Sequence, residues 1–196
     1  MKKVHMPKNK LLVKLLFISV ISILLGIFYM AIISKQNKES VEESLKLFFQ
    51  SINKLNYQKA IVNCLSSNIF YLLAIWLLGI SIIGIPFILL ILILKSFILG
   101  FSISSILYFY KLKGILIALI YIIPLVLNLL TILFLGYYAI IFSKNLIRLL
   151  FLKKEIRFKN IMRRYSKIFL FCLGMIIISS ILEIYVVPSF LKLLQI

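Results

Sequence analysis

The stretch Leu72-Leu-Ala-Ile-Trp-Leu-Leu-Gly-Ile-Ser-Ile-Ile-Gly-Ile-Pro86 decides the fold class, because it is uncharged and apolar almost throughout. It lies within a longer apolar territory, 61–143, that only three lysines interrupt. Apolar residues make up 63% of the 196-residue chain, whereas soluble domains contain about 45–50%. A single soluble core cannot hold this much apolar surface, so the lipid bilayer must be the solvent for most of it. The sequence therefore predicts an all-α integral membrane protein.

Turn signals divide the apolar territory into three transmembrane helices, each of which needs about 20 apolar residues. Gly84 and Pro86 mark the first division, and the segment 111–114 (Lys-Leu-Lys-Gly) marks the second. Two further apolar runs lie outside the territory, which brings the predicted number of spans to five. The predicted spans are 11–34, 66–84, 86–110, 115–143 and 168–190. An alternative division stays open, in which the second span covers 69–94 and turns at Lys95.

The distribution of basic residues predicts the orientation of these spans. The net charge is +18, from 23 Lys and Arg against five acids, and the charges form blocks between apolar runs. Such blocks fit the positive-inside rule better than a nucleic-acid-binding surface, so no nucleic-acid partner is expected. The basic N-terminal tail and the segment 144–167, with nine basic residues, are expected in the cytoplasm. The segment 35–60, which carries three glutamates, is expected outside, and the C-terminus with it.

The N-terminal apolar run at 11–34 is expected to remain as the first span. A secretory signal has an apolar core of about 7–15 residues followed by a small-residue cleavage site. This run is longer, and no such site follows it.

The outer segment 35–60 predicts an amphipathic helix near 41–55. Its apolar residues recur at steps of four and three, which places them on one helix face; they are Val41, Leu45, Phe48, Ile52 and Leu55. Ser40 and Glu43 form a Ser-x-x-Glu capping box at the expected start of this helix. The helix either rests on the outer leaflet or docks an extracytoplasmic partner.

Small and ionisable residues inside the spans are candidate packing and functional positions. Small residues four apart let helices approach closely, whether within one chain, with a partner or with a second copy; they are Ser22 and Gly26 in the first span and Ser96, Gly100 and Ser104 in the third. Ionisable groups inside a membrane are costly and usually face the bundle interior. Lys95 and Glu183 are the candidates, and we hypothesise that they pair. The alternative is that each extends toward its own interface.

Catalytic signatures are missing from the sequence. It contains no Asp and a single histidine, His5, in the N-terminal tail. Nucleophile elbows, zinc-binding His-Glu-x-x-His motifs and phosphate-binding loops are also missing. Cys64 and Cys172 are too few to form a disulfide framework. We therefore expect no enzymatic activity, no cofactor and no metal.

An ordered set of residues resembles the stage II sporulation protein M family of bacteria. The resemblance begins at the Leu72–Pro86 stretch, continues through Leu94-Lys-Ser-Phe-Ile-Leu-Gly-Phe-Ser102, and ends at Leu182-Glu-Ile-Tyr-Val-Val-Pro188. The matching positions are Gly79, Gly84, Pro86, Gly100, Lys113, Gly114, Glu183 and Pro188. The resemblance covers most of the chain and is clearest over 68–190.

The resemblance implies a membrane anchor and scaffold in an endospore-forming bacterium. Members of the family act in the mother cell during forespore engulfment, where they hold two peptidoglycan-cutting partners, a lytic transglycosylase and an amidase. The expected location is the mother-cell membrane at the sporulation septum. A permease or transporter subunit is the alternative, because spans interrupted by Gly or Pro and buried charges are typical of transport sites.

Overall fold

The computed structural model is all-helical and describes residues 8–53, 57–81, 83–151 and 158–193. Four of its helices, α1, α3, α4 and the α5 region, are long and apolar enough to cross a membrane. A shorter helix, α2, connects the first two. The elements are α1 (Lys8–Ile32), α2 (Lys35–Asn53), α3 (Tyr57–Ile80), α4 (Gly84–Phe151), α5 (Phe158–Ile181), the π-helix η1 (Leu182–Val186) and α6 (Val187–Leu193).

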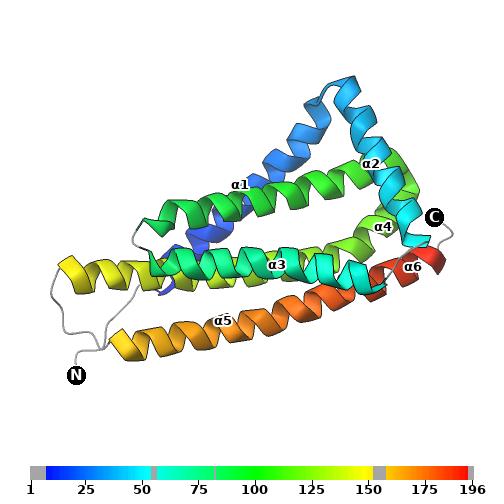
Figure 1. Cartoon of the computed structure of the whole chain (residues 1–196). Coiled ribbons are helices and arrows are strands. Elements are labelled where there is room, and N and C mark those ends of the chain that lie inside the picture. The colour runs from blue at the N-terminus through cyan, green and yellow to red at the C-terminus, as the bar shows by residue number, and fades with distance from the viewer. Residues whose placement is uncertain (1–7, 54–56, 82, 152–157, 194–196) are drawn as a thin grey trace.

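The longest helix, α4, is a hairpin of two arms that reverses at Lys111 (Figure 1). Lys111 has φ 45° and ψ −121°, a backbone conformation that breaks the helix and is strained for a residue with a side chain. A Cβ at Gly114 would collide with the carbonyl oxygen of Ile106, so glycine lets the two arms approach each other here. The reversal therefore falls at the segment 111–114 that the sequence marks as a turn.

The turn between α3 and α4 lies at Ser81–Gly84. A Cβ at Gly84 would overlap the carbonyl oxygen of Leu78, so a side chain there would obstruct the turn. Pro86 follows in the first turn of α4, where a missing N–H costs little. The alternative division at Lys95 is wrong, because Lys95 lies inside the first arm of α4.

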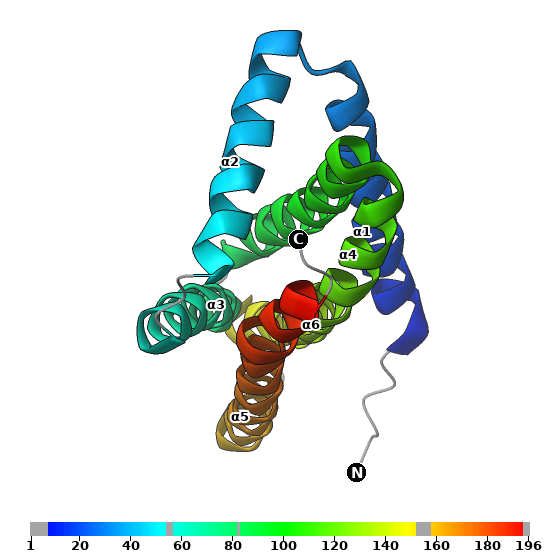
Figure 2. The same ribbon diagram turned by 90° about the vertical axis from the view of Figure 1, so that its right-hand side faces the viewer.

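The helices α3 and α5 and the two arms of α4 run alongside one another, α1 crosses them obliquely, and successive segments alternate in direction (Figure 1). One end of the bundle holds the start of α1, the turn from α3 to α4, the end of α4 and the start of α5. The opposite end holds α2, the reversal at Lys111 and α6, and Figure 2 looks onto it. The helix α3 begins before the predicted span 66–84 and ends at Ile80, and α5 begins before the predicted span 168–190 and ends at Ile181.

The main core forms where α3, the second arm of α4 and α5 pack together. Its central side chains are fully buried: Leu72, Ile75, Ile132, Leu135, Cys172 and Ile176. Gly79 on α3 leaves space for the Tyr165 hydroxyl, which donates a hydrogen bond to the carbonyl oxygen of Trp76 at 3.0 Å. A Cβ at position 79 would overlap the Tyr165 hydroxyl, so a larger residue would displace the tyrosine.

The helix α1 crosses the first arm of α4 at two glycines. A Cβ at Gly26 would overlap the carbonyl oxygen of Phe97, and one at Gly100 would overlap that of Ile23. Ser22 and Ser96 are buried beside this crossing, whereas Ser104 is partly buried and donates to the carbonyl oxygen of Phe101. The small-residue faces of the two helices thus pack against each other within the chain, as close-approach interfaces do in membranes.

The helix α2 begins at Lys35, six residues before the predicted start. The predicted capping box at Ser40 and Glu43 is therefore wrong. The Ser34 hydroxyl caps the helix by accepting from the Asn37 N–H at 3.4 Å, while Ser40 donates to the carbonyl oxygen of Gln36 within the helix. Glu43 is exposed.

The side of α2 that faces α4 differs slightly from the predicted apolar face. Phe49 is the most buried apolar residue of the helix, at 7% exposure, whereas Phe48 is 41% exposed. Val41 and Leu45 are partly buried on the same side. The side chain of Ile52 and the whole of Leu55 lie outside the described residues.

Candidate functional site

Buried polar side chains from α3, the second arm of α4 and α5 meet inside the bundle, and we call them the polar centre. Asn68, Asn128, Ser179 and Ser180 are each less than a tenth exposed. Cys64 and Glu183 are partly buried beside them. Polar groups in a bundle interior normally bond to one another, because lipid offers no partners.

Hydrogen bonds connect the three helices through Asn68. The Asn128 amide Nδ2 donates to Asn68 Oδ1 at 2.8 Å, and Asn68 Nδ2 donates to Ser180 Oγ at 3.1 Å. Ser179 Oγ donates to the carbonyl oxygen of Pro124 at 2.8 Å. The Asn128 Oδ1 atom is buried without a hydrogen-bond partner, so the centre retains one free acceptor.

Glu183 lies at the edge of the polar centre, within the π-helix η1. Cys64 Sγ donates to Glu183 Oε2 at 3.4 Å, and the carboxyl group also interacts with the Tyr121 hydroxyl. The widened turn is closed by the Val187 N–H, which donates to the carbonyl oxygen of Leu182. Pro188 follows directly and has no N–H to continue the regular pattern, which gives a physical reason for a π-turn at this place.

Lys95 approaches the polar centre from the first arm of α4. Its Nζ lies 3.7 Å from the centroid of the Tyr71 ring, a cation–π contact across to α3. It interacts electrostatically with Glu183 and Cys64, although the two charged groups form no direct ion pair in the structure. Lys95 and Glu183 therefore belong to one polar cluster, and their direct pairing stays a prediction.

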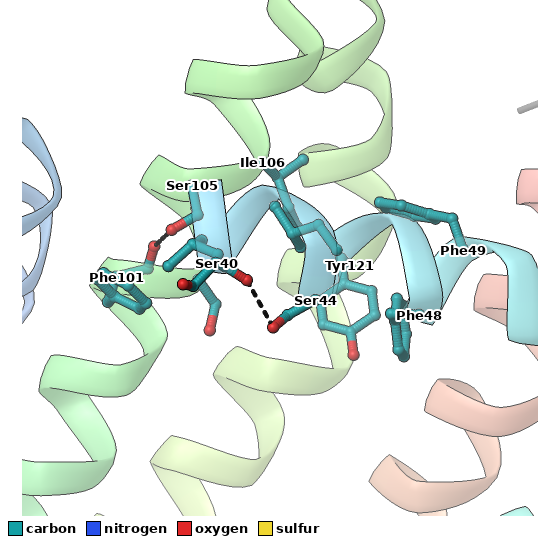
Figure 3. A pocket seen from close by; sticks show the side chains of 11 residues that line it. Ser40, Ser44, Phe48, Phe49, Phe101, Ser105, Ile106 and Tyr121 are labelled. Atoms are coloured by element: carbon teal, nitrogen blue, oxygen red, sulfur yellow. Dashed lines mark hydrogen bonds between the residues drawn. The ribbon is translucent and has the colours of Figure 1, made fainter. Parts of the chain in front are cut away.

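An open groove of about 410 Å³ separates α2 from α4 at the end of the bundle that holds α2 (Figure 3). Leu45 and Phe49 of α2 line one side, and Phe101 and Ser105 of α4 line the other. Tyr121 also lines the groove and carries the hydroxyl that interacts with Glu183. Tyr121 thus connects the groove to the polar centre.

The exposed part of α2 carries charged residues as well as apolar ones. Glu42 and Lys46 form an ion pair of 2.6 Å across one helical turn, and this contact raises the pKa of Lys46. The glutamate precedes the lysine in the sequence, which is the more favourable order for such a pair on a helix.

No group of three or more His, Cys, Asp or Glu side chains that might hold a metal occurs in the part of the chain that the structure describes. The polar centre offers amides, hydroxyls, one thiol and one carboxyl group. Sequence reasoning found Lys95 and Glu183 but missed Asn68, Asn128, Cys64 and Tyr121. The asparagines carried a usable signal, since an amide inside an apolar run is expected to face the bundle interior.

The fold and the polar centre define a polytopic α-helical membrane protein with a hydrogen-bonded interior. The family model described as Stage II sporulation protein M matches residues 15–188. The chain belongs to this family, as the resemblance in its sequence implies. Comparisons with curated proteins and with solved structures give no significant match.

Proposed function

We propose that this protein is a non-catalytic membrane anchor and scaffold for peptidoglycan-remodelling enzymes at the sporulation septum, needed for engulfment of the forespore. Membership of the stage II sporulation protein M family over 15–188 is the observation that carries the proposal. Its partners would be membrane-associated wall hydrolases, a lytic transglycosylase and an amidase, and a homo-oligomer is compatible with this role.

The proposed topology is five crossings, with the N-terminus in the cytoplasm and the C-terminus outside. A 68-residue α4 that reverses at Lys111 supports two crossings by this helix, each arm being longer than the about 20 residues that a bilayer requires. The alternating directions in Figure 1 support the same count. The nine basic residues of 144–167 then face the cytoplasm.

The outer helix α2 is the best candidate for the partner surface. The face formed by Ser96 and Gly100 is occupied by α1 within the chain, so it has little surface left for a partner. By contrast, α2 lies at the end of the bundle where wall enzymes would act. It presents an apolar side with Phe48 41% exposed and an adjoining groove.

Deletion of the gene in its host, imaged with a membrane dye during sporulation, tests the proposal. We expect arrest at a flat or bulged septum while vegetative growth remains normal, and recovery when the wild-type gene is returned. Affinity purification from the complemented strain should then co-purify the two wall hydrolases. Normal engulfment in the deletion strain would contradict the scaffold role.

A permease or transporter membrane subunit is a second candidate, and the polar centre is the observation that favours it. Transport sites lie near the middle of the membrane, where helices are broken and polar groups converge. The η1 π-helix at Glu183 and the free Asn128 acceptor have this character. A deletion strain that engulfs normally but loses uptake of a solute would favour this function.

A further inference from the structure

Six exposed basic residues lie on the last turns of α4 and the first turns of α5. These two helix ends lie at the end of the bundle opposite α2 (Figure 1). The two helices are in contact there, since the Phe142 and Phe158 rings lie 6.3 Å apart. We call these residues the basic surface. They are Lys144 and Arg148 on α4 and Lys159, Arg163, Arg164 and Lys167 on α5.

The basic surface has no carboxylate to neutralise it among the described residues. The carboxylates that the structure describes lie on α2 and in η1, and the ion pair at Glu42 belongs to α2 at the other end. In the sequence, the segment 144–167 holds nine basic residues and one acid, Glu155, which lies outside the described residues. The net charge of this segment is therefore nine minus one, or +8. An external anion would supply a counter-charge that the described residues lack.

The spacing of these cations is unfavourable for the helices themselves. Lys159, Arg163 and Lys167 follow at steps of four on α5, and Lys144 and Arg148 do so on α4. Like charges at this spacing destabilise a helix. Lys159 also lies in the first turn of α5, where the helix dipole is already positive. A bound anion would relieve both effects at once.

The change from charged to uncharged residues along α5 places the basic surface at the level of lipid headgroups. Beyond Lys167, α5 carries no charged residue up to its end at Ile181. An uncharged apolar run belongs in the hydrocarbon region, so the cations that directly precede it lie at the boundary of that region. The anions that meet these cations at this depth are phosphates of phospholipids in the same leaflet.

We propose that the basic surface formed by the end of α4 and the start of α5 binds the headgroup phosphates of anionic phospholipids. The orientation of a membrane protein depends on the number of basic residues on each side of the membrane. It does not require those residues to lie on one helix face or at a given spacing. The concentration of unpaired cations on two packed helices is what a phosphate-binding surface requires. This binding does not depend on the proposed scaffold function.

The test uses the full chain, purified in a non-ionic detergent. The protein is titrated with phosphatidylglycerol or with phosphatidylcholine of identical acyl chains. Lipid adducts are counted by native mass spectrometry, and the midpoint of thermal unfolding is recorded in parallel. We expect tighter retention of phosphatidylglycerol and a higher unfolding midpoint with it, both weakened by added salt. Equal retention of the two lipids would overturn the proposal.

Variants locate the binding. Arg163→Gln/Lys167→Gln should weaken phosphatidylglycerol binding about 25-fold, from about fivefold, or about 1 kcal/mol, for each basic residue near the surface. The matched control Lys35→Gln/Lys113→Gln removes two exposed lysines from the opposite end and should leave binding unchanged. The charge-conserving variant Arg163→Lys should retain binding, which separates loss of charge from misfolding.

Two further results would overturn the proposal. One is an equal loss of lipid binding in the control variant, since the basic surface would then have no special role. The other is equal stabilisation by inorganic phosphate at the same concentration, since the ligand would then be a free anion.

Discussion

Replacement of Asn68 by leucine should cause a large and specific loss of stability. Asn68 is 6% exposed and forms hydrogen bonds with Asn128 on α4 and Ser180 on α5. Leucine has a similar size but no polar atoms, so Asn68→Leu removes both interhelical bonds and little volume. It also leaves the Asn128 amide buried without this partner.

The magnitude follows from the two bonds and the orphaned amide. Interhelical hydrogen bonds in membranes contribute about 0.6 kcal/mol on average and at most about 1.7 kcal/mol. The two bonds therefore account for about 1–3 kcal/mol. A buried donor left without a partner costs about 1–3 kcal/mol more. We expect a total loss of about 2–5 kcal/mol, which lowers the unfolding midpoint by about 2–4 °C per kcal/mol for a chain of this length.

Thermal unfolding of the purified protein in detergent measures the effect. The control Asn63→Leu changes an exposed asparagine on the same helix and should stay within about 0.5 kcal/mol of wild type.

The double variant Asn68→Leu/Asn128→Leu provides the decisive comparison. It removes both partners and leaves no orphaned amide between them. The loss in the double variant should therefore be smaller than the sum of the two single losses, by about 1–2 kcal/mol. Strict additivity, or an Asn68→Leu midpoint equal to that of the control, would refute the hydrogen-bonded polar centre.

Three other substitutions test separate parts of the fold. Gly100→Ala pushes a Cβ into a backbone carbonyl of α1 and should cost about 1–3 kcal/mol in detergent melts, whereas Gly174→Ala enters open space and should cost nothing; equal midpoints would contradict the close crossing. Lys111→Gly should raise the midpoint, because it relieves a positive φ that costs about 1–3 kcal/mol; a lower midpoint would contradict strain at the reversal. Lys95→Glu should lower the amount of protein in membranes by immunoblot, and added Glu183→Lys should restore it; a double variant no better than the single one would refute their pairing.

The scaffold proposal and the polar centre are compatible with each other. A scaffold must hold its outer surface in a defined position while its partners pull or push on it. Interhelical hydrogen bonds fix the positions of α3, α4 and α5 relative to one another. Tyr121, which interacts with Glu183 beside these bonds, also lines the groove next to α2. The polar centre can thus stabilise one arrangement of the outer end.

The sequence by itself determined the membrane class, the family and the places where the chain turns. Apolar run lengths fix the number of helices a bilayer can accept. Local chemistry fixed the turns at Gly84 and at Lys111–Gly114, because glycine allows backbone approaches that a Cβ would block. These features depend on neighbours in the chain, which a sequence displays directly.

Tertiary structure alone decided which side chains meet. Asn68, Asn128 and Ser180 lie far apart in the sequence, and only the packing of three helices brings their polar atoms within 3.1 Å or less. The choice of Phe49 instead of Phe48 as the anchor of α2 depended on its rotation against α4. Membrane-spanning helices are apolar on nearly all sides, so their sequence pattern says little about how each helix is rotated about its own axis. The neighbouring helices supply that information through shape and hydrogen bonds.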